Sequence, residues 1–203
     1  MTKKITIHSF ADVDRSGKVR WTACELDYEI EEVQVKFGEH LGEDYQRINP
    51  YGQVPTATIE GENFIESTAI CVLLAERHPE AALIPTGRNV REQFWQQASL
   101  MVTTLELPLV GYFLAQKGFA NEHWADVAGD GLRRRLETFS ASLPAAGYLA
   151  GHFSLADIFA GYVLRIAVQA EILPYEGVLA EYLDRLRARP AAIASRVFDS
   201  LET

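Results

Sequence analysis

The chain has 203 residues, of which 48% are hydrophobic, and a formal net charge of -9. This length and apolar fraction suffice for a globular protein with its own core. The acidic balance repels the phosphates of nucleic acids, and the basic groups at 133–135 and 185–189 are short enough to be ordinary helix surface. We therefore expect no nucleic-acid partner.

The sequence also indicates in which cellular compartment the protein is expected. It contains no run of about 18 apolar residues, and no apolar signal-peptide segment follows Lys3 and Lys4. Cys24 and Cys71 are far apart and lack the spacing of a disulfide framework or a metal site. The sequence therefore predicts a cytoplasmic protein with no membrane partner, no metal and no disulfide framework.

The first eighty residues alternate between strand and helix periodicities. The predicted elements are a strand over 4–10, a helix over 16–26, a strand over 30–35, a hairpin over 56–65 and a helix over 67–78. A helix between two strands usually makes a right-handed crossover, so the first two strands should be parallel. Pro79 should end the last helix. The order is βαβ followed by ββα.

From about residue 88 onward, only helical periods occur. The predicted helices cover 89–116 with a bend near Pro108, 122–142, 155–171, 177–189 and 191–198. Ser154 with Asp157 predicts a capping box, and Phe153 with Ile158 a hydrophobic staple; we assign both motifs structural roles. We expect an α/β domain over 1–80, a linker over 81–87 and an all-α domain over 88–203.

Pro55 lies between two strand-like runs, although proline cannot donate a hydrogen bond to a sheet. If the Val54–Pro55 bond is cis, the Val54 amide and carbonyl turn outward and could pair with an extended peptide. Ser67, as the N-cap of the following helix, would leave free N–H groups that suit a carboxylate. The alternatives are a trans proline, a purely structural cap and, for Glu66, a surface charge.

Three motifs carry a resemblance to a known family. They are Asn49–Pro55 (NPYGQVP), Glu66–Ile70 (ESTAI) and Gly151–Asp157 (GHFSLAD). With the predicted order of elements, the chain resembles the soluble glutathione transferase family over essentially its whole length. The resemblance implies a thioredoxin-like N-terminal domain that binds glutathione as co-substrate. It also implies a helical-bundle C-terminal domain that forms one wall of an apolar second-substrate site, and a symmetric homodimer.

The resemblance also implies which residues bind glutathione. Val54, ahead of Pro55, would pair through its backbone with the cysteinyl part. Glu66 and Ser67 would hold the γ-glutamyl amine and carboxylate. Two further residues complete the implied set: Gln53 would assist, and His40 would approach the glycyl carboxylate. His40 could equally be an exposed loop histidine, and Lys36 is a weaker candidate for the same carboxylate.

Glutathione transfer needs a thiolate, whereas a free thiol is mostly protonated at neutral pH. In the family, a tyrosine, serine or cysteine just after the first strand lowers the thiol pKa. The matching stretch here, 8–21, contains neither tyrosine nor cysteine. One alignment puts Ser9 in the donor position and Arg15 beside the sulfur. Another alignment puts Val13 in the donor position, which would leave no hydroxyl there. The candidates are Ser9, then Arg15, then Ser16, against the alternatives of a strand-end serine, a surface arginine and an N-cap.

Two acidic residues in this loop, Asp12 and Asp14, would raise the thiol pKa if they faced it. The loop has no cysteine for disulfide chemistry, and Cys24 and Cys71 are interpreted as small buried residues. The resulting prediction is an enzyme that transfers glutathione to a small apolar electrophile. The alternative is a non-catalytic binding or scaffold protein of the same architecture.

Overall fold

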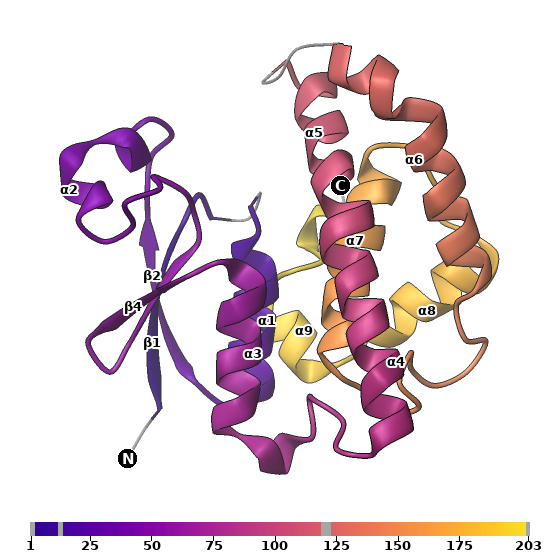
Figure 1. The fold of residues 1–203 in the computed structure, drawn as a ribbon, viewed down its shortest axis with the longest axis horizontal. Coiled ribbons are helices and arrows are strands. Elements are labelled where there is room, and N and C mark those ends of the chain that lie inside the picture. The colour runs from indigo at the N-terminus through magenta and orange to yellow at the C-terminus, as the bar shows by residue number, and fades with distance from the viewer. Residues whose placement is uncertain (1–2, 12–13, 119–122, 202–203) are drawn as a thin grey trace. The chain divides into compact units, whose positions relative to one another are not determined.

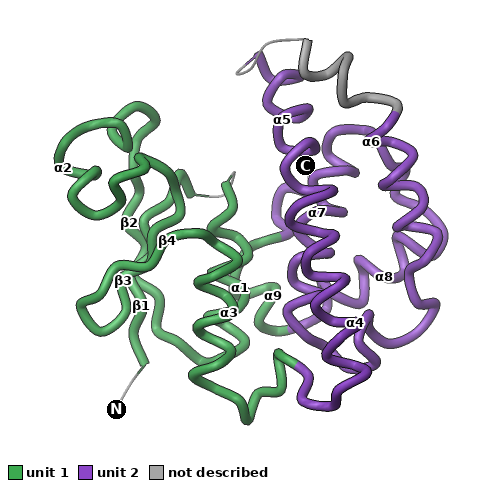
Figure 2. The backbone as a smooth tube through the Cα atoms, in the orientation of Figure 1, with its two compact units in different colours: residues 1–84, 190–197 green, residues 85–189, 198–203 purple. Residues whose placement is uncertain are grey.

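The computed structural model describes residues 3–11, 14–118 and 123–201, with only the helical backbone described over 123–130. The chain forms two compact units, one of residues 1–84 with 190–197 and the other of 85–189 with 198–203 (Figure 2). The sequence predicted one boundary between the domains, over 81–87, and did not predict that residues 190–197 belong to the first unit. There, helix α9 (Pro190–Ser195) packs against helix α1 (Ser16–Glu25).

The first unit is built on a four-stranded mixed sheet (Figure 1). The strands are β1 (Lys4–Ser9), β2 (Glu29–Gln34), β3 (Thr56–Ile59) and β4 (Glu62–Ile65), in the order β2-β1-β3-β4. β1 and β2 are parallel, whereas β3 is antiparallel to both β1 and β4. This topology confirms the predicted βαβ-ββα order and the thioredoxin-like fold.

Every second side chain of β1 packs into the core of this unit. Ile5 and Ile7 are buried, while the alternate residues Thr6 and His8 are partly exposed. Helices α1 and α3 (Ser67–Arg77) lie side by side, and their buried residues include Val19, Trp21, Ile70 and Leu74. Apolar burial of this kind contributes about 1.5–3 kcal/mol for each large side chain. The end of β1 and the start of α1 are thereby held in place.

The stretch between β2 and β3, which the sequence left irregular, contains a 3-10 turn (Glu39–Leu41) and the short helix α2 (Glu43–Gln46). Four residues are too few to show a 3.6-residue period, so the pattern could not predict this helix. Tyr45 is its only buried residue. The segment is therefore anchored through one side chain.

The second unit is helical, as predicted. Its main elements are α4 (Arg88–Ser99), the π-helical stretch η3 (Leu100–Glu106), α5 (Leu107–Gln116), α6 (His123–Ala141), α7 (Leu155–Gln169) and α8 (Gly177–Arg187). The sequence predicted a bend near Pro108; the helical run is continuous there, and the π-helical stretch ends two residues before the proline. Proline lacks an N–H and clashes with the carbonyl four residues earlier, and a wider turn relieves the conflict.

Residues Arg88–Gln116 form one helical run of 29 residues that is long and apolar enough to cross a membrane. Phe94, Met101, Leu105 and Leu109 on this run are buried within the second unit, at the spacing of one helix face. This is the pattern of a core helix.

Helix α7 is the centre of the second unit, and every residue over 155–167 is buried. The predicted capping box is confirmed: the Asp157 carboxylate accepts the Ser154 N–H at 2.9 Å. It also accepts the Leu149 N–H at 2.9 Å and the Tyr182 hydroxyl at 2.7 Å. Burial raises the pKa of Asp157, and these hydrogen bonds oppose the increase. The capping residue therefore ties α7 to α8 and to the loop before it.

Replacing this carboxylate should be costly. Asp157→Ala leaves four donors, the Ser154 hydroxyl among them, without this acceptor, so we expect the free energy of unfolding to fall by about 3 kcal/mol. Urea denaturation followed by circular dichroism measures the change. The control Asp184→Ala removes an exposed carboxylate that binds Tyr175 and should cost about 0.5 kcal/mol or less. Equal losses in the two variants would contradict this role of Asp157.

Candidate functional site

A cleft in the first unit brings together the loop before β3, the start of α3 and the start of α1. It is lined by Arg15, Asn49, Tyr51, Gln53, Val54, Pro55, Ile65, Glu66 and Ser67. Of the residues predicted to bind glutathione, Gln53, Val54, Pro55, Glu66 and Ser67 line this cleft, and His40 does not. Of the three candidates for thiol activation, only Arg15 lines the cleft.

The main chain at Val54 is open, as the peptide hypothesis requires. The Val54–Pro55 peptide bond is cis, and β3 begins one residue later at Thr56. Within the described part of the chain, no residue makes a hydrogen bond to the Val54 N–H or carbonyl. An extended ligand could therefore pair with both groups.

Two residues that the sequence did not single out fix this loop. The Tyr45 hydroxyl donates to the Gln53 carbonyl at 2.9 Å, and the Asn49 amide donates to the same oxygen at 2.7 Å. The Asn49 Oδ1 accepts the Tyr51 N–H at 3.0 Å and closes an Asx-type turn. The Asn-Pro pair in the motif was the available signal for Asn49, whereas nothing in the local pattern pointed to Tyr45.

The start of α3 differs by one residue from the prediction. Glu66, with φ of 66°, occupies the N-cap position, and Ser67 is the first residue of the helix, so the expectation that Ser67 is the N-cap was wrong. Helical bonding begins with the Ile70 N–H, which donates to the Glu66 carbonyl at 2.9 Å. The N–H groups of the first turn have no intrahelical acceptor and carry the positive end of the helix dipole. The cleft therefore retains a place for a carboxylate.

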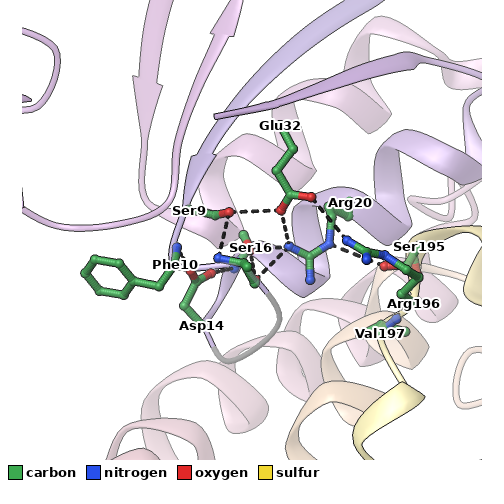
Figure 3. Close-up of polar contacts among 10 residues, drawn as sticks. Ser9, Phe10, Asp14, Ser16, Arg20, Glu32, Ser195, Arg196 and Val197 are labelled. Atoms are coloured by element: carbon green, nitrogen blue, oxygen red, sulfur yellow. Dashed lines mark hydrogen bonds and ion pairs between the residues drawn. The ribbon is translucent and has the colours of Figure 1, made fainter. Parts of the chain in front are cut away.

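Ser9 and Ser16 lie in a buried polar network beside the cleft (Figure 3). The Ser9 hydroxyl donates to Glu32 Oε1 at 2.9 Å and accepts the Ala11 N–H at 3.1 Å. The Ser16 Oγ accepts from the Arg20 guanidinium at 2.7 Å. Both side chains are fully buried and have partners within the protein.

Arg20 is the centre of this network. Its side chain is 4% exposed, and its guanidinium contacts Glu32 Oε1 at 2.7 Å. It also donates to the Ser195 carbonyl at 3.3 Å, which ties α1 to the segment 190–197. Arg196, from the same segment 190–197, forms an ion pair with Glu32 at 3.4 Å and so joins this network (Figure 3). Residues far apart in sequence thus hold the loop after β1.

Asp14 contributes to the same loop. Its carboxylate accepts the Ser16 N–H at 2.5 Å and the Phe10 N–H, and so caps the start of α1. Burial raises the pKa of Asp14, and these hydrogen bonds oppose the increase. Asp12 and Val13, which also entered the sequence interpretation, lie outside the described residues.

His40 does not line the cleft, although its backbone lies beside Gly52 in the loop that does. Its ring packs against Phe10 and Phe37, with ring centroids 4.9 and 5.4 Å apart, and its Nδ1 accepts the Gly38 N–H at 3.1 Å. Lys36, the weaker candidate, has an exposed side chain that pairs with Glu39 at 3.7 Å. The structure gives both residues a local role in the turn that precedes α2.

Cys24 and Cys71 lie on α1 and α3 and do not line the cleft. Burial raises the pKa of the Cys24 thiol, which disfavours the thiolate. The two charged side chains that line the cleft are Arg15 and Glu66, one of each sign. The fold is thioredoxin-like, and its cleft combines an open main chain at Val54 with the start of a helix and one side chain of each charge.

Comparison with known proteins shows which family the chain resembles. Residues 8–82 match the sequence profile described as Glutathione S-transferase, N-terminal domain. The structure of a glutathione transferase from Methylococcus capsulatus is 25% identical, with a TM-score of 0.79, over 97% of this chain and 99% of that one. Glutathione S-transferase 3 of Zea mays is 27% identical over 82% of this chain and 80% of that protein. The chain is thus similar to soluble glutathione transferases, through the family's N-terminal-domain profile over residues 8–82 and through relatives that align with most of its length.

Other matches are shorter or more distant. Four curated plant glutathione transferases at 30–34% identity are matched over only 36–48% of their own length. The theta class glutathione S-transferase from Xanthomonas axonopodis pv. citri, solved with glutathione bound, is 24% identical, with a TM-score of 0.80, over 96% of this chain and 97% of that one. At this identity the likeness shows the fold alone.

The network around Arg20 generates a stability prediction. Glu32→Gln removes the carboxylate from a buried guanidinium, so we expect the free energy of unfolding to fall by about 2 kcal/mol. The control Glu29→Gln, on the same strand, removes only the exposed pair with Lys4 and should cost about 0.5 kcal/mol or less. Urea titration compares the variants. A Glu32 variant as stable as its control would show that the pair does not hold the loop.

Proposed function

We propose that this protein binds glutathione in the cleft and transfers it to a small apolar electrophile. The observation that carries the proposal is the open Val54 backbone, held next to the first turn of α3. A tripeptide with a carboxylate at its γ-glutamyl end would satisfy both features. The match of residues 8–82 to the glutathione transferase N-terminal-domain profile and the glutathione-bound neighbours of the same fold support it.

In this proposal each group of glutathione has a partner. The cysteinyl backbone pairs with Val54, ahead of Pro55. The γ-glutamyl carboxylate binds Ser67 and the N–H groups of the first turn of α3, and its amine binds the Glu66 carboxylate. Gln53 assists, and His40 is the partner for the glycyl carboxylate. Hydrogen bonds to charged groups contribute about 1.5–3 kcal/mol each, so the γ-glutamyl end dominates the affinity.

We assign thiol activation to Arg15. The Ser9 hydrogen is directed to Glu32 and the Ser16 hydroxyl to the Ala11 carbonyl, so neither hydroxyl is aimed at the cleft. Arg15 lines the cleft next to the loop after β1, and a cation near the sulfur favours the thiolate. Arg15 therefore replaces the hydroxyl donor that this loop lacks.

A second candidate function is a non-catalytic glutathione-binding protein. The observation that favours it is the engagement of both loop hydroxyls within the buried network. For either function we propose a homodimer, as the family resemblance implies, and a cytoplasmic location, as the cysteine usage suggested.

Calorimetry with glutathione and a spectrophotometric conjugation assay with 1-chloro-2,4-dinitrobenzene test the proposal. We expect saturable binding with turnover, and about a tenfold loss of affinity in Ser67→Ala because a hydrogen bond to the carboxylate is lost. Glu62→Gln, an exposed change on β4 outside the cleft, is the control. Binding without turnover would favour the second candidate, and no binding would refute both. Light scattering in the same buffer reports whether the mass is twice 22.7 kDa.

The role of Arg15 predicts a change in the bound thiol. Arg15→Gln should raise the pKa of the enzyme-bound glutathione thiol by about one unit and lower kcat about tenfold at neutral pH, because the thiolate loses a nearby cation. The ultraviolet absorbance of the thiolate, recorded against pH, measures the pKa. Ser9→Ala is the comparison and should leave it unchanged. A shift in the serine variant alone would reverse the assignment.

A further inference from the structure

The first unit contains a second group of polar side chains, at the end of the sheet where β1 and β2 begin. Tyr28 lies between α1 and β2, and His78 and Glu80 follow the end of α3. The Tyr28 hydroxyl oxygen and His78 Nε2 are 3.0 Å apart, and so are His78 Nδ1 and Glu80 Oε1. None of these three residues lines the cleft, and the proposed function does not use them.

The direction of the two hydrogen bonds follows from the chemistry of the groups. The pKa of Glu80 is lowered by its own backbone N–H and by His78, which keeps this carboxylate ionised. An ionised carboxylate only accepts, so His78 Nδ1 carries the hydrogen between them. In a neutral imidazole Nε2 is then the acceptor, and the Tyr28 hydroxyl donates to it. The hydroxyl is therefore bonded to a base that a carboxylate orients.

Local structure holds the three side chains in this arrangement. Pro79 cannot continue α3, and it begins a short 3-10 turn that contains Glu80. His78 is the C-cap of α3, so this turn sets its distance from Glu80. The Tyr28 N–H donates to the Ala23 carbonyl at 3.0 Å, which fixes the tyrosine at the end of α1. The packing of α1 against α3 then brings Tyr28 to His78.

Two cations lie near Tyr28. Burial raises the pKa of Tyr28, the Arg77 guanidinium opposes the increase, and Glu60 adds to it. Arg77 is held beside the tyrosine by its ion pair with Glu60, at 3.3 Å. The Lys3 Nζ lies 5.5 Å from the centre of the Tyr28 ring. Cations in this position stabilise a negative oxygen that forms next to the hydroxyl.

We propose that Tyr28, His78 and Glu80 form a second reactive centre, which hydrolyses small activated carboxylic esters without glutathione. A hydroxyl bonded to a base that a third group orients is the arrangement of a nucleophilic triad. The side chains of His78 and Glu80 are 17% and 71% exposed, and Tyr28 is partly exposed, so a small ester can approach from solvent. The centre is separate from glutathione transfer and does not depend on it.

The reaction proceeds in two acyl-transfer steps. The Tyr28 oxygen bonds to the ester carbonyl carbon while its proton passes to His78 Nε2, and Glu80 stabilises the imidazolium. The bond from that carbon to the alcohol oxygen then breaks, and His78 returns the proton to the leaving alcohol. Water hydrolyses the acyl-tyrosine in the same way, with His78 moving a proton from water to the Tyr28 oxygen. The products are the carboxylic acid and the alcohol, and nothing is oxidised or reduced.

Hydrolysis of p-nitrophenyl acetate in buffer without glutathione tests the proposal. We expect Tyr28→Phe and His78→Gln each to lower kcat/KM about tenfold or more, because the nucleophile or its base is lost. Glu80→Gln should lower it about threefold, since the imidazolium loses its counter-charge. Glu80 is exposed, so this variant keeps the test valid if a change at Tyr28 disturbs folding. Mass spectrometry of the quenched parent should find the acetyl group on Tyr28.

The controls separate this centre from the cleft and from tyrosines in general. Tyr175→Phe removes a hydroxyl that donates to Asp184, and its rate should equal that of the parent. Saturating S-hexylglutathione, which would occupy the cleft, should also leave the rate unchanged, so a failure here is distinct from a failure of glutathione transfer. The proposal is overturned if the parent is no faster than buffer, or if the Tyr28 and Glu80 variants match the parent. It is also overturned if S-hexylglutathione abolishes the activity or if acetyl groups are found only on other residues.

Discussion

The carbonyl oxygen of Gln53 is the point on which the candidate site depends. It accepts hydrogen bonds from the Tyr45 hydroxyl and the Asn49 amide, and both donors also contact Thr56 Oγ1 at the start of β3. This arrangement fixes the loop through the Gln53 carbonyl, while the backbone groups of Val54 have no hydrogen-bond partner among the described residues. A rigid and open main chain is what a peptide ligand requires, because little conformational entropy is then lost on binding.

A second constraint acts on the loop after β1. A guanidinium that is 4% exposed must be surrounded by acceptors, and Arg20 finds them in Glu32, Ser16 and the carbonyl of Ser195. Meeting this requirement engages the Ser16 hydroxyl, and the Ser9 hydroxyl donates to the same Glu32 carboxylate. The structure therefore leaves Arg15 as the candidate that lines the cleft.

The sequence predicted the architecture because the signals are local and repeated. The alternation around Ile5 and Ile7, the helical period from residue 88 onward and the capping box at Ser154 each involve neighbours within a few residues. The approximate place of the site was also predictable, since Val54, Glu66 and Ser67 lie in short motifs. The exact start of α3 was not, because Glu66 adopts a positive φ that no local pattern required.

The sequence by itself determined the two kinds of secondary structure, their order and the loop that carries the cleft. Only the tertiary structure decided which side chains face that cleft. Ser9 meets Glu32, which is 23 residues away, and Arg20 meets Ser195, which is 175 residues away. Tyr45 reaches Gln53 from a helix too short to show a period. A buried polar group forms such a hydrogen bond with whichever partner the fold brings within about 3 Å. The spacing of residues along the sequence does not predict which partner that is.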